Sequence, residues 1–469
     1  MTYTIEKVTT LIGARRYGDR DGNVGFILTD SRSLCFPEET LFFALKSERN
    51  DGHNYIPELY RRGVRNFVVS QVPKGYASDY PEANFLKVVN TLEALQRLAE
   101  RHRDEFNIPI VGITGSNGKT MVKEWLHQLL SPSMFVTRSP RSYNSQIGVP
   151  LSVWLLNEQT QVGVFEAGIS QPGEMLALRD IIQPTIAVLT YLGAAHQENF
   201  ESLEAKCREK IILFHDADTI VYNGDDKTVS GVVNEYKDYK GEKLFWSFRD
   251  TKAPFFVKNV EKKGNLSIIT YIYKGEEDSY SLPFIDEASV TNSIIAAVVS
   301  RRLGLSAEEL DKRMALLEPV AMRLEVKEGQ HGCTLINDSY NSDINSLDIA
   351  LDFMSRRPDH KGRRHTLILS DIFQSGESAK DLYHEVSDLC RKRGVVKFIG
   401  IGPQLCSQSD EIQISEKFFF SNVEEFIDSE VFKSLRDEVI LLKGARQFGF
   451  DQLTELLVRK VHEKIGRAH

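Results

Sequence analysis

A glycine-rich stretch carries the strongest chemical signal in the sequence. It reads Gly112-Ile113-Thr114-Gly115-Ser116-Asn117-Gly118-Lys119-Thr120 and joins an apolar run, Ile108–Thr114, to Met121–Leu130, whose apolar residues recur at helical spacing. A loop between a strand and the start of a helix turns backbone N–H groups toward a phosphate. Lys119 can neutralise the β- and γ-phosphates there, and Thr120 can place its hydroxyl on Mg²⁺. The predicted contacts to the nucleotide are Gly115, Ser116, Asn117, Gly118, Lys119 and Thr120.

The spacing departs by one residue from the common phosphate-loop pattern G-x-x-x-x-G-K-[ST]. Five residues, not four, separate Gly112 from Gly118, so the stretch is not the generic loop. The alternative interpretation is a glycine-rich turn that binds no nucleotide. The position of Gly118-Lys119-Thr120, at the junction of a strand with a helix, favours the phosphate loop.

The elements around this loop indicate the α/β class. Between about residues 107 and 317, strand-like apolar runs alternate with helical patterns, which predicts parallel strands joined by helices. One stretch differs: in Phe255–Leu282, Thr, Tyr, Ile, Val and Lys alternate, which predicts a peripheral antiparallel hairpin or meander. The other strand-like runs of this central segment are Ile108–Thr114, Val162–Ala167, Thr185–Tyr191 and Thr219–Tyr222.

Two further segments flank the central one. Residues 1–106 have short apolar stretches at Gly25–Leu28 and Asn66–Ser70 and end in a predicted helix, Thr91–His102. Residues 318–469 again alternate strands with helices and end in a predicted helix, Phe450–Ile465. We therefore predict three domains, at 1–106, 107–317 and 318–469. The strands predicted in the last one are Thr334–Asn337, Thr366–Ser370, Lys397–Gly400, Lys417–Phe420 and Val439–Leu442.

Composition excludes several classes of protein. The chain has 469 residues, enough for about three domains. Its 58 Lys and Arg against 66 Asp and Glu leave a formal charge of −8, which argues against nucleic acid as the main ligand. No apolar run reaches the roughly 18 residues that cross a bilayer, and no secretion signal is visible, so no membrane insertion is expected. The five cysteines are scattered without a C-x-x-C pair, which fits a reducing cytoplasm.

The loop Thr114–Thr120 resembles the ATP-binding loop of the Mur ligases, the amide ligases that build peptidoglycan. These proteins have a UDP-sugar-binding domain, a central P-loop ATPase with a parallel sheet, and a C-terminal Rossmann-like α/β domain. The resemblance runs through the whole chain in that order and implies this three-domain architecture. In the central segment it continues through Tyr143–Pro150, Phe165–Gly168, Ala195–Phe200 and Asn223–Asp226.

The outer segments most resemble the Mur ligases that add D-alanyl-D-alanine. The tetrapeptide Asp-Asn-Pro-Arg, usual in the sibling that adds a diamino acid, is absent. The resemblance implies an ATP-dependent ligase of peptidoglycan precursor synthesis, with UDP-N-acetylmuramoyl-tripeptide and D-alanyl-D-alanine as its substrates. The matching residues are Asp30–Arg32, Leu41–Leu45, Asp51–His53, Arg323–Glu325, Asp338–Asn341 and Lys443–Arg446.

The implied reaction first turns a carboxylate into an acyl phosphate, which an amine then attacks. Two anions meet in the first step, so cations must be in place beforehand. Lys119 and Mg²⁺ supply them. Thr120, Glu166 and His196 form the predicted metal site, because Glu166 and His196 follow strands and ligands of open α/β sheets collect at the carboxyl ends of strands.

In this family a lysine after the histidine segment is carbamylated by CO₂. Lys210, just before Ile211–Phe214, has the matching spacing, and Lys206 is the competing candidate. A carbamate requires a neutral amine, hence a lysine whose pKa is lowered by burial or by nearby cations. The resemblance therefore implies that Lys210 bridges to a second Mg²⁺ and is catalytic together with Lys119 and His196.

The remaining implied contacts come from all three segments. Those with ATP are Asn292, Arg323, Asp338 and Asn341, and those with the substrate are Ser31, Arg32, Asn144, Lys443 and Arg446. The adenine segment keeps only Asn292 of the usual His-Asn-x-x-Asn, and Gln374 stands where a glutamate is usual.

Three alternatives stay open. One is a sibling Mur-type ligase with another amino substrate. A folylpolyglutamate-type ligase is disfavoured by the Asp30-Ser31-Arg32 segment ahead of the loop. The last is a non-catalytic ATP-binding regulatory module, against which the full set of Lys119, Thr120, Glu166 and His196 argues. The end of the chain soon after Ile465 suggests the ligase half of a fusion with an alanine racemase.

Overall fold

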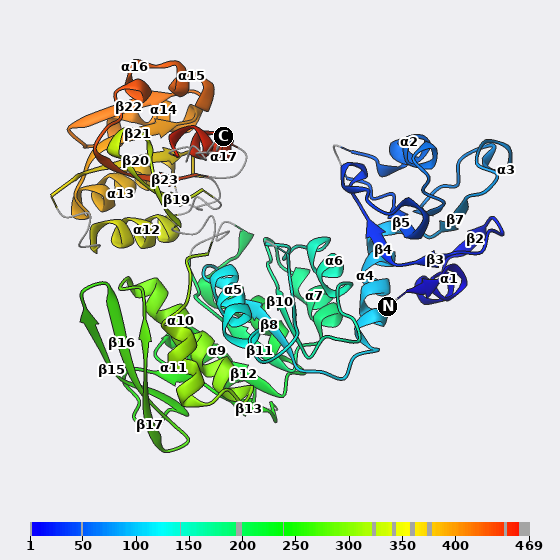
Figure 1. Cartoon of the computed structure of the whole chain (residues 1–469), viewed down its shortest axis with the longest axis horizontal. Helices are drawn as coiled ribbons and strands as arrows, with labels where there is room; N and C mark the ends of the chain where they lie inside the picture. The colour runs from blue at the N-terminus through cyan, green and yellow to red at the C-terminus, as the bar shows by residue number, and fades with distance from the viewer. Residues whose placement is uncertain are drawn as a thin grey trace, which may run out of the picture.

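The computed structural model describes residues 2–47, 50–140, 142–193, 199–237, 239–320, 325–339, 344–356, 362–372, 378–444 and 448–458. Figure 1 shows three groups of elements along the chain, from the N-terminal segment in blue through the central one in cyan and green to the C-terminal one in yellow and red. Both the central and the C-terminal groups are α/β, with mainly parallel sheets. No helix of the described ranges is long and apolar enough to cross a membrane.

The N-terminal segment contains a five-stranded sheet in the order β2-β7-β6-β5-β4, in which only β2 and β7 pair antiparallel. Its last helix, α4, begins after Asn90, whose side chain accepts hydrogen bonds from two N–H groups of the first turn. Leu95 and Leu98 of α4 are fully buried against this sheet. The two short apolar stretches of the sequence form β4 and β6, and the predicted helix is confirmed. The elements are β1 (Tyr3–Thr4), α1 (Ile5–Ile12), β2 (Arg15–Tyr17), β3 (Asn23–Val24), β4 (Phe26–Leu28), β5 (Thr40–Phe43), α2 (Ile56–Arg61), β6 (Asn66–Val69), α3 (Tyr76–Asp79), β7 (Asn84–Lys87) and α4 (Thr91–Arg103).

The central segment contains a six-stranded parallel sheet in the order β13-β12-β11-β8-β10-β9. The strand order reverses at β8, and ligands of such sheets bind beyond the carboxyl ends of the strands at the reversal. The predicted parallel arrangement is confirmed. The elements are β8 (Ile110–Thr114), α5 (Lys119–Leu130), β9 (Val136–Arg138), α6 (Gly148–Val153), β10 (Val162–Glu166), α7 (Glu174–Ile182), β11 (Ile186–Leu189), α8 (Leu203–Ile211), β12 (Thr219–Val221), α9 (Lys227–Glu235) and β13 (Glu242–Lys243).

A four-stranded sheet, β14-β15-β16-β17, lies beside the central sheet (Figure 1). Its three long strands form the predicted antiparallel meander. Residues of β16 alternate between buried and less buried because one face packs on the core. Helix α10 is buried around most of its circumference from Val290 to Ser300. The elements are β14 (Trp246–Ser247), β15 (Phe255–Lys263), β16 (Leu266–Tyr273), β17 (Glu276–Leu282), α10 (Glu287–Arg302) and α11 (Ala307–Met314).

The C-terminal segment contains a six-stranded sheet in the order β18-β19-β23-β20-β21-β22, parallel except for β18. All five predicted strands are present. Of the predicted helix Phe450–Ile465, the described part is helical to Leu457; Val458 is extended and bridges to Gly329, and 459–465 lie outside the described residues. The elements are β18 (Glu325–Glu328), β19 (Thr334–Asp338), α12 (Ile344–Arg356), β20 (Arg364–Ser370), α13 (Ala379–Lys392), β21 (Val395–Ile401), α14 (Pro403–Ser407), β22 (Glu416–Phe420), α15 (Val423–Asp428), α16 (Glu430–Lys433), β23 (Glu438–Lys443) and α17 (Phe450–Leu457).

Candidate active site

The glycine-rich loop joins the end of β8 to the start of α5, at the strand reversal of the central sheet. Gly115 and Gly118 have φ of +144° and +88°, values that favour glycine. A Cβ on Gly115 would lie 2.0 Å from Thr190 Oγ1, and one on Gly118 would lie 2.4 Å from Asn292 Oδ1. The loop therefore needs both glycines for its conformation and for its close contacts with β11 and α10.

The Lys119 side chain folds back over this loop. Its Nζ donates to Gly115 O at 2.8 Å and to Ser116 O at 3.4 Å. Thr190, just after β11, donates to Asn117 O at 2.5 Å and so fixes the middle of the loop. The buried Asn117 Nδ2 has no hydrogen-bond partner among the described residues, a donor that a ligand could satisfy.

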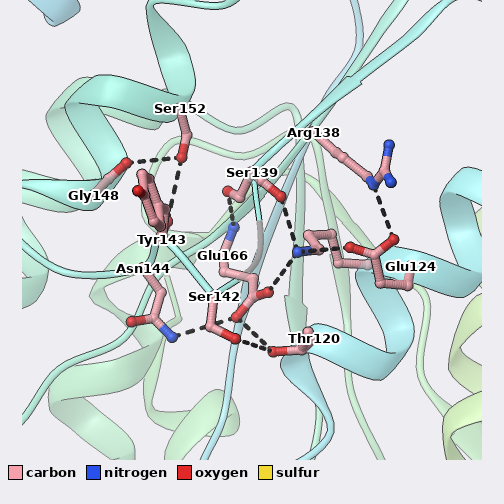
Figure 2. A network of polar contacts seen from close by, with 11 residues as sticks. Thr120, Glu124, Arg138, Ser139, Ser142, Tyr143, Asn144, Gly148, Ser152 and Glu166 are labelled. Atoms are coloured by element: carbon pink, nitrogen blue, oxygen red, sulfur yellow. Dashed lines mark hydrogen bonds and ion pairs between the residues drawn. The ribbon is translucent and has the colours of Figure 1, made fainter. Parts of the chain in front are cut away.

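A buried carboxylate stands beside the first turn of α5. Glu166 ends β10 and is fully buried. Its Oε2 accepts from Thr120 Oγ1 at 3.1 Å and from Asn144 Nδ2 at 3.3 Å, as Figure 2 shows. Ser142 Oγ lies 3.2 Å from Thr120 Oγ1. The structure thus brings together the predicted residues Thr120, Glu166 and Asn144, all with oxygen or amide groups of the kind that surrounds Mg²⁺.

Two lysines of α8 point to the loop region, and their surroundings differ. Lys210 Nζ donates to Gly115 O at 3.3 Å, the same carbonyl that Lys119 contacts. Burial lowers the pKa of Lys210 well below its ordinary value, and the charges of Lys119 and Lys206 lower it further. Lys206 Nζ instead donates to Gly193 O. Lys210 therefore meets the condition set for a carbamate, a buried amine whose neutral form is favoured.

A cavity of about 360 Å³ opens in front of these groups. Its walls come from the loop, from the segment before α6, from the segment before α7, and from single residues of α4 and α8. Of the predicted residues, the loop, Asn144 and Lys210 share this cavity. The lining residues are Gly115–Thr120, Asn144–Ile147, Gly168–Ser170, Leu92, Glu174 and Lys210.

Two predicted residues of the C-terminal segment that the structure describes, Asp338 and Lys443, are paired with each other. Asp338 ends β19 and Lys443 ends the neighbouring β23. Lys443 Nζ donates to Asp338 Oδ2 at 2.8 Å, and both side chains are buried. The predicted roles, ATP contact for Asp338 and substrate contact for Lys443, did not include this ion pair. In a buried, low-dielectric setting each charge compensates the other.

Other predicted residues lie apart from the cavity or outside the described ranges. Asn292 of α10 contacts Gly118 of the loop, and its Nδ2 lies 3.2 Å from Met121 Sδ. In the N-terminal segment Ser31 is buried, whereas the side chain of Arg32 is 88% exposed and binds Asp30. The predicted positions outside the described residues are His196, Arg323, Asn341, Arg446 and Gln374.

Several residues of the site have no counterpart in the sequence-based prediction. Ser142 and Thr190 gave no signal, because a lone hydroxyl residue is common in loops. Lys123 is four residues after Lys119, so its position on the same face of α5 could be predicted from the sequence. Gln146 was within a recognised segment, but its contact with Gln96 of α4 depends on tertiary structure.

Comparison with known proteins connects this geometry to a family. A family model described as the Mur ligase middle domain matches residues 113–300. The UDP-N-acetylmuramoyl-tripeptide–D-alanyl-D-alanine ligase of Bacillus subtilis (strain 168) is 28% identical over 368 residues, which are 76% of each chain. The ligase of the same name from Buchnera aphidicola is 26% identical over 473 residues, 99% of this chain and 100% of the relative. The chain is thus similar to Mur ligases over nearly its whole length, and residues 113–300 match their middle domain.

Solved structures of Mur ligases share the fold over nearly the whole chain. MurF from Acinetobacter baumannii matches with a TM-score of 0.82 at 21% identity, covering 97% of this chain and 99% of that one. MurF from Thermotoga maritima in complex with ADP matches with a TM-score of 0.75 at 22% identity, covering 92% and 96%. The predicted Mur ligase architecture is confirmed. As a Mur ligase, this protein is an ATP-dependent ligase.

Proposed function

We propose that this Mur ligase joins D-alanyl-D-alanine to UDP-N-acetylmuramoyl-tripeptide through an acyl phosphate, in the synthesis of peptidoglycan precursors. The observation that carries the proposal is the similarity, over 99% of the chain, to a ligase of that name. The site supports the same chemistry, because a phosphate loop and a lysine of lowered pKa line one cavity, and a buried carboxylate contacts Thr120 of that loop.

Lys119 is proposed to hold the γ-phosphate during its transfer to the substrate carboxylate. Its Nζ donates to Gly115 O and Ser116 O, so the ammonium already lies over the loop whose amides would bind the phosphates. The loop amides from Gly115 to Thr120 would bind the remaining phosphate oxygens at the N-terminus of α5. In the second step the amine of the dipeptide attacks the acyl carbon, and inorganic phosphate leaves.

The oxygen donors of Thr120 and Glu166 fit a Mg²⁺ ion. A hydroxyl and a carboxylate oxygen 3.1 Å apart, at the end of β10 and the start of α5, are hard ligands of the type that this ion prefers. When bound, Mg²⁺ neutralises charge on the phosphates. Thr120 and Glu166 would hold it together with His196, which lies outside the described residues.

Lys210 is proposed to be carbamylated. Its neutral amine would form a C–N bond with CO₂ and release one proton, which replaces a cation by a carboxylate in the cavity wall. The support is its burial and its lowered pKa, with Lys119 and Lys206 as the neighbouring cations. The resulting anion could bind a second Mg²⁺ and would relieve the repulsion among the three lysines.

The outer segments are proposed to be domains with the boundaries 1–106 and 318–469, around a central domain at 107–317. Ser31 and the exposed Arg32 would bind the nucleotide sugar, and Asn144 the substrate near the cavity. Asn292, beside Gly118, would approach ATP from α10. Asp338 would contact ATP and Lys443 the substrate, from the adjacent ends of β19 and β23, where the two side chains are paired. We also propose that Arg323 and Asn341 contact ATP and that Arg446 contacts the substrate.

Two further parts of the hypothesis concern the setting of the protein. We propose that it acts in the cytoplasm, in line with its cysteine pattern. We also keep the sequence-based prediction that an alanine racemase is fused to this ligase or associates with it.

The test is phosphate release from ATP and Mg²⁺ with UDP-N-acetylmuramoyl-tripeptide, with and without D-alanyl-D-alanine. We expect release that requires both substrates, together with a pentapeptide product seen by mass spectrometry. Release with another amine, such as a diamino acid or glutamate, would keep the ligase but reject the dipeptide. Nucleotide binding without release for any amine would favour the regulatory module instead.

A further inference from the structure

Lys123 is a fully buried cation that contacts three of the residues labelled in Figure 2, Ser139, Glu166 and Glu124. It follows Thr120 by three residues and therefore lies on the same face of α5. Its Nζ donates to Ser139 O at 2.9 Å and lies 3.1 Å from Glu166 Oε1 and 3.0 Å from Glu124 Oε1. A buried ammonium is costly unless it is paired, so these contacts fix the place of the lysine.

The two oxygens of Glu166 face different partners. Oε1 faces Lys123, and Oε2 faces Thr120 and Asn144. The backbone N–H of Glu166 donates to Ser139 Oγ at 3.2 Å, while Ser139 O accepts from Lys123. These contacts fix the orientation of the carboxylate, in which Oε1 faces Lys123 and Oε2 faces Thr120.

The charges around Lys123 cancel. Glu124 also accepts from Arg138 Nε at 3.0 Å, so two carboxylates and two cations form one network. Glu166 needs such compensation, because a buried carboxylate without a cation is strongly destabilised. Lys123 thus supplies the cation that faces Glu166 Oε1.

We propose that Lys123 is a positioning residue for the metal ion of the nucleotide: it holds Glu166 by Oε1 so that Oε2 is presented to the ion beside Thr120. This inference rests on the proposed function, because it assumes that Mg²⁺ accompanies ATP at Thr120 and Glu166. Lys123 acts through Glu166 and touches neither the nucleotide nor the substrate. The positive charge of Lys123 also repels Mg²⁺. We expect the gain in Mg²⁺ affinity from the fixed orientation of Glu166 to exceed the loss from this repulsion.

The test measures how strongly Mg²⁺ and the nucleotide assist each other's binding. The dissociation constant of AMP-PNP is determined by calorimetry in EDTA and in saturating Mg²⁺, and the ratio of the two is the coupling factor. We expect Lys123→Gln to reduce this factor at least about tenfold while affinity in EDTA changes less than about threefold. Lys123→Met removes the amino group without replacing it by a polar group, and it should reduce the coupling factor as Lys123→Gln does. If it does not fold, Lys123→Gln decides, since its amide can still donate to Ser139 O.

Glu124→Gln is the matched control, because it changes the other carboxylate that contacts Lys123 but not the one beside Thr120. We expect it to leave the coupling factor within about threefold of the parent. In a Glu166→Gln background, Lys123→Gln should have almost no further effect, since the two residues act as a unit. A coupling factor that is unchanged or larger in Lys123→Gln would overturn the proposal. So would a coupling factor that falls equally in Glu124→Gln, or reductions by Lys123→Gln and Glu166→Gln that add up in the double variant. A parent protein that binds AMP-PNP in neither condition would instead reject the proposed function.

Discussion

At the scale of single residues, Lys119 provides the most direct test of the phosphate loop. Its Nζ donates to the carbonyl oxygens of Gly115 and Ser116, both within the loop that Lys119 itself ends. We therefore expect Lys119→Ala to keep the fold and to lower the rate of ligation by about 10²–10³-fold, the effect of removing one group that stabilises transferred charge. Phosphate release and the thermal unfolding midpoint measure the two effects. Lys312→Ala, an exposed helix lysine paired with Glu308, is the control and should retain activity.

Lys210 tests a different chemical role at the same scale. If it acts as a carbamate, Lys210→Ala should lose most activity, and a small carboxylic acid such as formate or acetate should restore part of it by filling the cavity left at the wall. The measurement is ligation rate against carboxylic acid concentration. Lys206→Ala is the matched variant, since Lys206 is equally buried on α8 but donates to Gly193 O. Rescue of Lys206→Ala and not of Lys210→Ala would reverse the assignment.

At the scale of elements, the strands of the two α/β segments were predictable because each is a short apolar run between turn or helix signals. The loop, Thr120 and Glu166 were predictable as well, because strand ends in a parallel sheet meet at one edge. The pairing of Asp338 with Lys443 was not, since it depends on β23 lying next to β19 although 105 residues separate them. The end of α17 was missed for a similar reason: Val458 leaves the helix to bridge Gly329, a contact invisible in the local pattern.

Helix α4 carries a prediction about how elements support the site. Gln96 Nε2 on α4 donates to Gln146 Oε1 at 2.9 Å, and Gln146 Nε2 donates to Glu174 O at the start of α7 at 3.0 Å. Gln146 lines the cavity two residues after Asn144. Gln96→Ala should therefore loosen the segment that presents Asn144 and raise the KM for the muramoyl substrate several-fold, with a loss of about 1 kcal/mol in unfolding free energy.

Steady-state kinetics and urea unfolding check this prediction together. Gln183→Ala is the control, because its amide binds Asp104 just after α4, away from the cavity. The effects of Gln96→Ala and Gln146→Ala should be less than additive when combined. Fully additive effects on KM would show that the contact between the two amides does not matter for the substrate.

At the scale of the whole molecule, one buried cluster ties the N-terminal segment to the central one. His102 near the end of α4 contacts Tyr3 OH of β1 through Nδ1 at 2.8 Å and Leu156 O through Nε2 at 3.0 Å. A carbonyl only accepts, so Nε2 carries the hydrogen and Nδ1 accepts from Tyr3. Trp154 packs on the His102 ring with centroids 4.6 Å apart, and its Nε1 donates to Gly25 O at 2.9 Å. This junction requires a neutral histidine.

The junction should therefore weaken in acid. Burial lowers the pKa of His102 from 6.5 to about 4. Above about pH 6.5 the histidine is neutral in both the folded and the unfolded chain, so its contribution to stability is fully present. As the pH falls from about 6.5 to about 4, only the unfolded chain takes up the proton, and the unfolding free energy should drop by up to about 3 kcal/mol.

Urea unfolding between about pH 7.5 and about pH 4.5, compared between the parent and His102→Gln, isolates this contribution from that of the carboxyl groups, which titrate in both proteins. The glutamine amide can still donate to Leu156 O but takes up no proton, so the variant should be less stable near neutral pH and lose less on acidification. His384→Gln on α13, an exposed histidine, should follow the parent. Parallel curves for the parent and His102→Gln would mean that acid acts elsewhere, and the junction would then hold the two segments together regardless of the charge on His102.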